Sequence, residues 1–218
     1  MSVGYRLHTN GWSVYTDIGR VKSSSYRMSD MFYRVNFWQI ELTEKKSPKQ
    51  EKLIVDESAT GSSGSYYYGK INNFYGLKLG YGKRKMIAGK PDPGSVSIHW
   101  ANSISGCLGV LKPYYLNIDG GLNAIKYSEA TQGEFLDQRF ILGSAGFGAG
   151  LDELKMIPGG SFKSMLHFDF ATNRKSALAI ETGLNFEYYA QPVPIMAGEE
   201  GEPYFFDIFV AIQFGKRW

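Results

Sequence analysis

The sequence ends in the stretch Tyr204-Phe-Phe-Asp-Ile-Phe-Val-Ala-Ile-Gln-Phe-Gly-Lys-Arg-Trp218, in which large apolar side chains occupy alternate positions. Successive side chains of a β-strand leave opposite faces, so this period of two predicts a strand that runs to the last residue. Apart from Lys216, its apolar register holds Phe206, Ile208, Val210, Ile212, Phe214 and Trp218. A last strand that ends on an aromatic residue is typical of the strand that closes a β-barrel.

The same alternation recurs along the whole chain. It predicts further strands over residues 2–9, 12–20, 31–43, 70–85, 95–105, 162–171 and 177–188. Asn10-Gly11 predicts a tight hairpin between the first two, because both central positions of a type I′ turn need positive φ. In the third strand the apolar register changes after Phe37, which predicts a β-bulge. Residues 106–157 leave the strand count open: eight if they are mostly loop, ten if they supply another pair.

The composition favours strands over helices. Aromatic residues make up 15% of the 218 residues, and there are 26 glycines. No apolar run approaches the ~18 residues that a membrane helix needs. The mean hydropathy of −0.26 is compatible with barrel strands, whose polar and apolar positions alternate. We find no repeat and no linker, so residues 1–218 are expected to form a single domain.

Three features favour a membrane barrel over a soluble one. The apolar face of each clear strand is almost free of charge, the polar face is rich in small residues, and aromatic residues lie near strand ends. The sequence therefore predicts an all-β fold: a closed antiparallel transmembrane β-barrel of the outer membrane, in contact with membrane lipids that include lipopolysaccharide. A soluble, lipocalin-like binding barrel stays an alternative, since it too has one polar and one apolar face.

The connections support a consistent orientation. With both termini in the periplasm, residues 86–94 and 172–175 become short periplasmic turns, and residues 44–69, 106–159 and 192–203 become long extracellular loops. No signal peptide follows Met1, although an outer-membrane protein needs one. We expect it in the genomic sequence upstream of this start.

The polar face would then point into the barrel. Charges in a narrow lumen must be paired, so a network of mixed sign is expected to fill the barrel and leave no wide channel. Arg6 is a candidate neighbour of Asp207. The predicted luminal network consists of Arg6, Asp17, Lys78, Lys163, His167, Asp169, Glu181, Glu187 and Asp207.

Catalytic chemistry has weak support in the residues. His167 and Asp169 share a face, and a neighbouring strand carries His99 with Ser97 and Ser103, but nothing in the sequence fixes a nucleophile to its base. We therefore expect no catalytic, cofactor or metal site. The single Cys107 has no ligand partner at a metal-binding spacing. The net charge of +3 is dispersed, so nucleic acid is not an expected partner.

Several segments carry a resemblance to a known family. They are Gly82-Lys-Arg-Lys-Met-Ile-Ala-Gly-Lys-Pro91, Pro93-Gly-Ser-Val-Ser-Ile-His-Trp100, Leu111-Lys-Pro-Tyr-Tyr115, Glu153-Leu-Lys-Met-Ile-Pro-Gly159 and Phe214-Gly-Lys-Arg217. The chain resembles small outer-membrane β-barrel proteins of Bacteroidota. The resemblance implies a non-enzymatic accessory subunit of a larger envelope complex, for outer-membrane protein assembly or secretion, with other outer-membrane or periplasmic proteins as partners. A barrel enzyme that hydrolyses lipid or peptide, through His167, Asp169 or His99, is the alternative.

Overall fold

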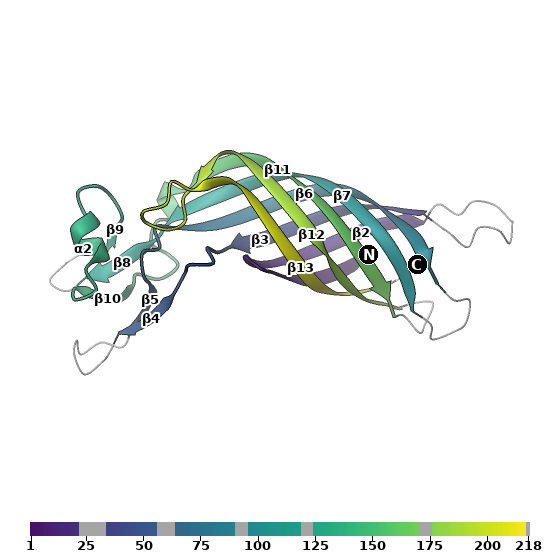
Figure 1. Cartoon of the computed structure of the whole chain (residues 1–218), viewed down its shortest axis with the longest axis horizontal. Helices are drawn as coiled ribbons and strands as arrows, with labels where there is room; N and C mark the ends of the chain where they lie inside the picture. Colours follow the sequence, from purple (N-terminus) through teal and green to yellow (C-terminus); the bar gives the residue numbers. More distant parts are fainter. Residues whose placement is uncertain (22–33, 56–63, 90–95, 119–123, 171–175, 217–218) are drawn as a thin grey trace, which may run out of the picture.

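Eight long strands close into an antiparallel barrel (Figure 1). The computed structural model describes residues 1–21, 34–55, 64–89, 96–118, 124–170 and 176–216. Around the barrel the order is β1-β13-β12-β11-β7-β6-β3-β2. The bounds are β1 Ser2–His8, β2 Gly11–Val21, β3 Arg34–Lys45, β6 Asn72–Ala88, β7 Ser97–Pro113, β11 Lys155–Asp169, β12 Ser176–Val193 and β13 Glu202–Lys216. The predicted closed barrel is confirmed, with eight strands rather than ten.

The last strand closes the barrel against the first, as the sequence predicts. β13 pairs with β1, and Ala211 lies opposite Arg6 in the register. Trp218 and Arg217 lie outside the described residues. The other predicted residues of the apolar register are exposed on the outer wall: Phe206, Ile208, Val210, Ile212 and Phe214.

The predicted bulge at Phe37 is wrong. β3 pairs without interruption with β2 and with β6, and the Phe37 side chain points into the barrel with 2% of its surface exposed. The space for its ring comes from Gly82 on β6, where an added Cβ would lie 2.3 Å from the Phe37 Cζ atom. The apparent change of register is therefore one aromatic residue on the inner face, beside a glycine.

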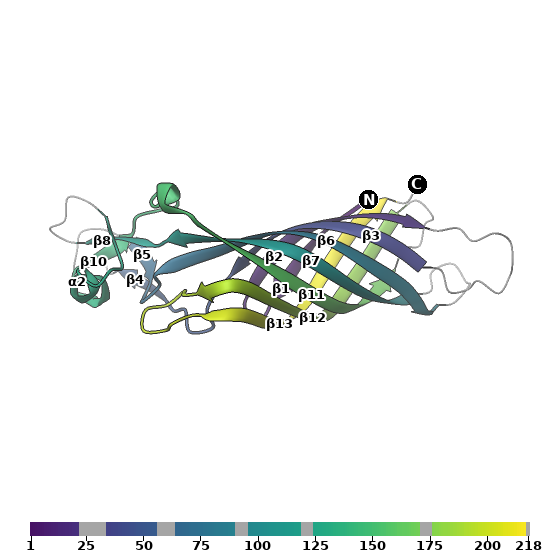
Figure 2. The same cartoon turned by 90° about the horizontal axis from the view of Figure 1, so that it is seen from above.

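Beyond the barrel, two long connections fold into a small cap (Figures 1 and 2). β4 (Lys52–Val55) pairs with β5 (Gly64–Tyr67). A second sheet has the order β10-β8-β9, from Ile141–Ser144, Tyr115–Ile118 and Ile125–Lys126. The same connection holds the short helix α2 (Gln132–Leu136), and the 3₁₀ turn η1 (Leu151–Glu153) precedes β11. The cap core is Tyr66, Leu116, Phe135 and Ile141.

The cap and the chain termini lie at opposite ends of the barrel (Figures 1 and 2). We call the end that carries the cap the distal end. The predicted long loops 44–69, 106–159 and 192–203 all reach the distal end, although β7 extends to Pro113 and takes up part of the second. Turn 172–175 and most of turn 86–94 lie outside the described residues. Among the described helices, none has the length and apolar character to cross a membrane.

Candidate functional site

The centre of the barrel is built around one carboxylate, Glu41 on β3. Arg6 donates to its Oε2 atom at 2.5 Å, Lys78 lies 3.5 Å from its Oε1 atom, and Lys163 also binds Oε2. All four side chains are essentially inaccessible to solvent. They come from β1, β3, β6 and β11, so these bonds join strands from different sides of the barrel.

Towards the termini, the network continues through Glu181. Its carboxylate accepts hydrogen bonds from Arg6 at 3.0 Å and from the Tyr15 hydroxyl at 2.7 Å. Arg84 donates to it at 3.2 Å, and His167 Nδ1 lies 2.9 Å from it. The Arg6 guanidinium also stacks 3.6 Å from the centre of the Tyr15 ring, which adds a cation–π contact.

Towards the distal end, the network continues through Glu187 and Asp207. Lys45 binds both carboxylates, at 2.9 Å and 2.5 Å, and Lys78 binds Glu187 at 2.5 Å. The Asn185 amide donates to both, at 2.7 Å and 2.9 Å. A buried charge is tolerated when it is paired, and Lys45, Lys78, Glu187 and Asp207 each have a partner of opposite sign here.

The resulting ion-pair network contains charges of both signs. Among the described residues, the lysine and arginine ion pairs inside the barrel join five cations to five carboxylates. The cations are Arg6, Lys45, Lys78, Arg84 and Lys163, and the carboxylates are Asp17, Glu41, Glu181, Glu187 and Asp207. Side chains of both signs thus occupy the lumen at mid-height, as expected for a barrel of about eight strands.

All nine residues of the predicted luminal network are buried inside the barrel. The predicted contact between Arg6 and Asp207 is wrong: Arg6 binds Glu41 and Glu181, whereas Asp207 binds Lys45, Asn185 and His8. The pair fails because strand tilt and side-chain length, which the alternation does not encode, decide which charges meet across the lumen.

Three central charges are absent from the prediction. The predicted bulge at Phe37 reverses the parity of the residues that follow, so it assigns Glu41 to the wrong face of β3. Lys45 falls in a charged stretch that resembles a loop. Arg84 lies in the basic run Lys83-Arg84-Lys85, where only the middle side chain turns inward. The signal that identifies them is the unbroken register: Glu41 and Lys45 share the parity of Phe37, and Arg84 shares that of Lys78.

The histidines considered for catalysis are part of the barrel interior. His167 contacts Glu181 through Nδ1 and Arg84 through Nε2, so both ring nitrogens have charged partners. Its ring lies 5.6 Å from that of His99 on the paired strand β7. Within the described residues, no group of three or more His, Cys, Asp or Glu side chains is arranged to hold a metal ion. Outside the barrel, the Glu153 carboxylate accepts a hydrogen bond from Lys126 at 2.6 Å.

The distal mouth of the barrel is closed by the connection between β12 and β13. Ile71 and Asn72, just before and at the start of β6, donate their backbone N–H groups to Ile195 at 2.9 Å and 3.3 Å. Ala197 donates to Gly69 at 2.7 Å. We call this connection, residues 194–201, the lid. An apolar layer, the mouth cluster, lies next to the ion-pair network and includes Ile195 and Met196 of the lid; its other members are Phe74, Cys107, Leu111, Ile157, Tyr189 and Val193.

Lys70 lies buried beside this lid. Burial lowers the pKa of its ammonium group to about 8, with Glu44 opposing that shift and Lys46 and Lys112 adding to it. The ammonium nitrogen lies 5.0 Å from the centre of the Tyr67 ring, a cation–π contact that replaces part of its lost hydration.

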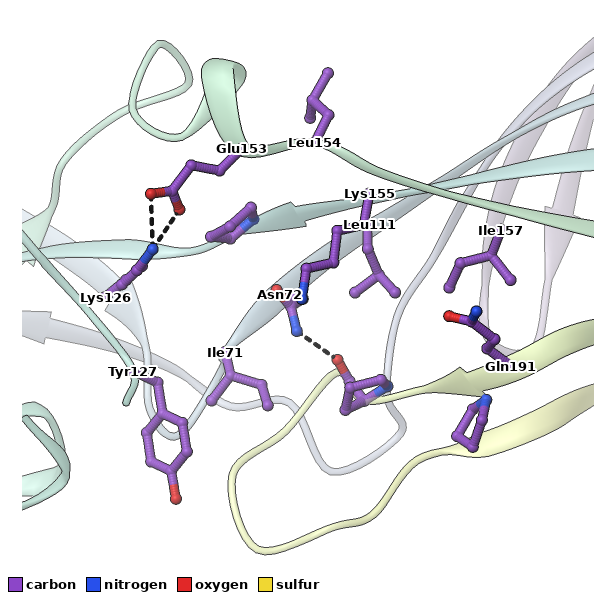
Figure 3. Close-up of a pocket in the computed structure, with 13 residues that line it drawn as sticks. Ile71, Asn72, Leu111, Lys126, Tyr127, Glu153, Leu154, Lys155, Ile157 and Gln191 are labelled. Carbon is purple, nitrogen blue, oxygen red and sulfur yellow. Dashed lines mark hydrogen bonds and ion pairs between the residues drawn. The ribbon is translucent and has the colours of Figure 1, made fainter. Parts of the chain in front are cut away.

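A cleft of about 590 Å³ opens between the barrel rim and the cap (Figure 3). β11 pairs with β7 from Lys155 onward but with β12 only from Gly159 onward. β11 and β12 therefore diverge at the distal end. Pro158 and Pro192 lie where the strands diverge, and proline cannot donate to a sheet ladder. The cleft is lined by Ile71, Asn72, Tyr127, Lys155, Ile157 and Gln191, among others.

Two contacts hold the walls of the cleft (Figure 3). Asn72 donates its side-chain amide to the Pro194 carbonyl at 2.8 Å, which fixes the barrel side. Lys126 binds both oxygens of Glu153, at 2.7 Å and 2.6 Å, which fixes the cap side, and this hydrogen bond lowers the pKa of Glu153. The cleft is therefore a preformed surface with apolar, amide and cationic groups.

No protein-family model, curated protein or solved structure matches this chain. The fold and the site define the class: an eight-stranded closed β-barrel with a charge-filled interior, an apolar outer wall and a folded cap.

Proposed function

We propose that the protein is an outer-membrane β-barrel and acts there as a non-enzymatic accessory subunit of a larger cell-envelope complex. The outer wall supports the membrane location, because its outward side chains are large and apolar on all sides of the barrel. Examples are Leu7 on β1, Ile40 on β3, Ile104 on β7, Phe162 on β11 and Phe206 on β13, all exposed. A soluble protein rarely exposes a continuous apolar band of this kind.

The single observation that carries the accessory role is the combination of a filled barrel with a folded cap. The ion-pair network and the mouth cluster occupy the interior, which argues against conduction. The cap has a core of its own, with Leu116 and Phe135 both fully buried, which argues that it presents a defined surface. A preformed surface lowers the entropic cost of binding a partner.

We assign the cleft between rim and cap as the contact surface. Its walls are fixed by Asn72 and by the Lys126–Glu153 pair, while Gln191 is an exposed residue on its barrel side. With the termini in the periplasm, this surface faces the cell exterior. The partner is then another outer-membrane subunit of the complex, with periplasmic subunits reaching the opposite end.

Extraction from native envelopes in mild detergent, followed by size-exclusion chromatography, tests the role. We expect the wild-type protein to elute with a co-purifying protein at fixed stoichiometry. Gln191→Arg, which places a long cation in the cleft, should release that partner, whereas Glu200→Arg, on the connection that follows β12 and outside the cleft lining, should retain it. A lone wild-type monomer would contradict the accessory role. Recovery in the aqueous phase without detergent would favour the soluble binding barrel instead.

A further inference from the structure

A second hollow, the rim pocket, lies on the outer wall where β1 and β2 turn. It has a volume of about 370 Å³ and combines two kinds of surface. Tyr5, Leu7 and Trp12 form its apolar part, and Asn10, Lys46 and Ser47 form its polar part. The pocket therefore crosses the border between the apolar outer wall and the polar distal end.

The apolar part continues the outer wall of the barrel. Tyr5 and Leu7 are outward residues of β1, with 47% and 59% of their surface exposed. Across the hairpin, the Trp12 ring stacks on Tyr5 with 6.2 Å between ring centres and 24° between planes. Tryptophan and tyrosine side chains near the end of a barrel strand are typical of the border between lipid chains and headgroups.

The polar part holds one cation that is poorly neutralised. The ammonium group of Lys46 lies 3.9 Å from Glu44 Oε2, at the limit of an ion pair, and its side chain is 40% exposed. That same oxygen already accepts a hydrogen bond from Trp12 Nε1 at 2.6 Å. Such a long, exposed pair contributes little, so the charge of Lys46 is free to meet another anion.

The backbone around Lys46 is fixed in place. The Lys46 N–H group donates to the Asn10 carbonyl at 2.7 Å, which ties the start of this connection to the β1–β2 turn. Ser47 then accepts two hydrogen bonds, from the Lys49 N–H group at its Oγ and from the Gln50 N–H group at its carbonyl, at 3.2 Å and 3.1 Å. The base of the Lys46 side chain is thus held at the edge of the pocket.

We infer that the rim pocket binds a membrane lipid with a phosphate-bearing headgroup. Lys46 meets the phosphate as a compact point charge, and Tyr5, Leu7 and Trp12 contact the upper part of an acyl chain. The inference rests on the proposed membrane location but not on the proposed partner. Both a phosphorylated glycolipid and a glycerophospholipid carry the shared chemistry.

Native mass spectrometry of the detergent-purified protein tests this inference. Lipid A, phosphatidylglycerol, diacylglycerol and inorganic phosphate are added separately to the wild type, to Lys46→Gln and to the control Lys49→Gln. Lys49 is an exposed lysine of the same connection, paired with Glu199 and outside the pocket. We expect Lys46→Gln to lower the bound fraction of phosphate-bearing lipid by about tenfold, the value of one charged contact, and Lys49→Gln to leave it unchanged.

The four ligands distinguish the possible sources of the phosphate group. Preference for lipid A over phosphatidylglycerol, or the reverse, identifies the lipid class. The inference is overturned if Lys46→Gln and Lys49→Gln bind the phosphate-bearing lipid equally well, or if diacylglycerol binds as well as that lipid. It is also overturned if inorganic phosphate binds at Lys46 as strongly as the lipid, because the ligand would then be a soluble anion. Flotation of wild type and Lys46→Gln with liposomes reports membrane location separately. Failure of the proposed location is thereby distinguished from loss of headgroup selection.

Discussion

The barrel and the cap bury different kinds of side chain. Inside the barrel lie paired charges such as Arg6 and Glu41, with a small apolar cluster that includes Phe37 and Phe209, while most large apolar side chains of the barrel strands point outward. Inside the cap lie Leu116 and Phe135, as in an ordinary water-soluble core. One chain thus follows two burial rules, which is expected if the barrel wall meets lipid and the cap meets water.

The mouth cluster is the boundary between these two interiors. Phe74 packs edge-on against Tyr189, with 5.0 Å between ring centres, and stacks on Phe205 at 5.6 Å. The hydroxyl of Tyr189 reaches down to Glu187 at 2.8 Å, so one side chain belongs to both the apolar layer and the ion-pair network. The change from charged to apolar interior therefore takes place within one layer of aromatic residues.

The largest expected effect comes from breaking the barrel interior at its centre. Glu41→Ala leaves Arg6, Lys78 and Lys163 without their shared carboxylate, and an unpaired buried charge costs roughly 3–5 kcal/mol of unfolding free energy. Denaturant unfolding of the protein refolded in detergent measures this loss.

The matched control for Glu41 is an ion pair at the surface. Glu199→Gln removes the partner of Lys49, whose side chain is 77% exposed, and should leave the unfolding midpoint unchanged. Glu41→Gln keeps the shape of the side chain and should still destabilise the barrel. Equal stability of all three variants would show that the buried charges are neutral in the lumen, contrary to the pairing described above.

A second substitution breaks the cap and spares the barrel. Phe135→Ala removes a fully buried ring of the cap core that packs against Tyr127, and such truncations cost about 3–5 kcal/mol. We expect the cap to become sensitive to protease while the heat-dependent shift of the barrel in electrophoresis stays normal.

Phe140→Ala is the control for the cap, because Phe140 belongs to the same connection but is 45% exposed. It should leave the protease pattern unchanged. If Phe135→Ala also removed the electrophoretic shift of the barrel, the two regions would unfold together, and the contrast between them would not extend to stability.

The barrel strands were predictable because the pattern that defines each of them lies within a short stretch of sequence. The alternation from Phe206 to Phe214 gives the inner and outer faces directly, and a strand of that pattern has few other structures available. The inward charges that lie within clear alternation, such as Lys163 and Glu181, could be assigned in the same way. Burial thus follows from the parity of a residue within its strand.

The cap and the partners of each charge were not predictable in this way. The cap strands have two to four residues, too few to show a period, and some pair across long gaps in the sequence, as Ile118 pairs with Ile141. Residues 106–157, which leave the strand count open in the sequence, accordingly divide between the end of β7, the cap strands β8, β9 and β10, and the start of β11. Which cation meets which carboxylate depends on distances across the lumen, and these are set by the folded barrel and not by the alternation within one strand.

A third substitution tests how closely the barrel interior is packed. Gly82→Ala places a Cβ 2.3 Å from the Phe37 ring and 2.8 Å from the Asn102 carbonyl, so overpacking should cost about 1–3 kcal/mol of unfolding free energy. Gly106→Ala is the control, since an added Cβ there meets nothing within 4 Å. Phe37→Leu combined with Gly82→Ala should recover part of the loss. A neutral Gly82→Ala would mean that the Phe37 ring can move aside.

The smallest expected effect is a pH dependence of the mouth, at the boundary between the two regions. The pKa of Lys70 is about 8 when folded and 10.5 as the reference value for the opened chain, so between these values the opened state binds more protons. Stability therefore rises as the pH rises through this window, and below pH 8 the buried charge carries its full penalty. Hydrogen exchange of the Ile71 and Ala197 amides, corrected for intrinsic rates, should show protection factors that increase from pH 7.5 to pH 9.5. Lys70→Met should abolish that increase, and an equal increase in the variant would assign the effect to another group. The effect is the smallest of the four because only the lid opens, while the barrel below it and the cap above it keep their own interiors.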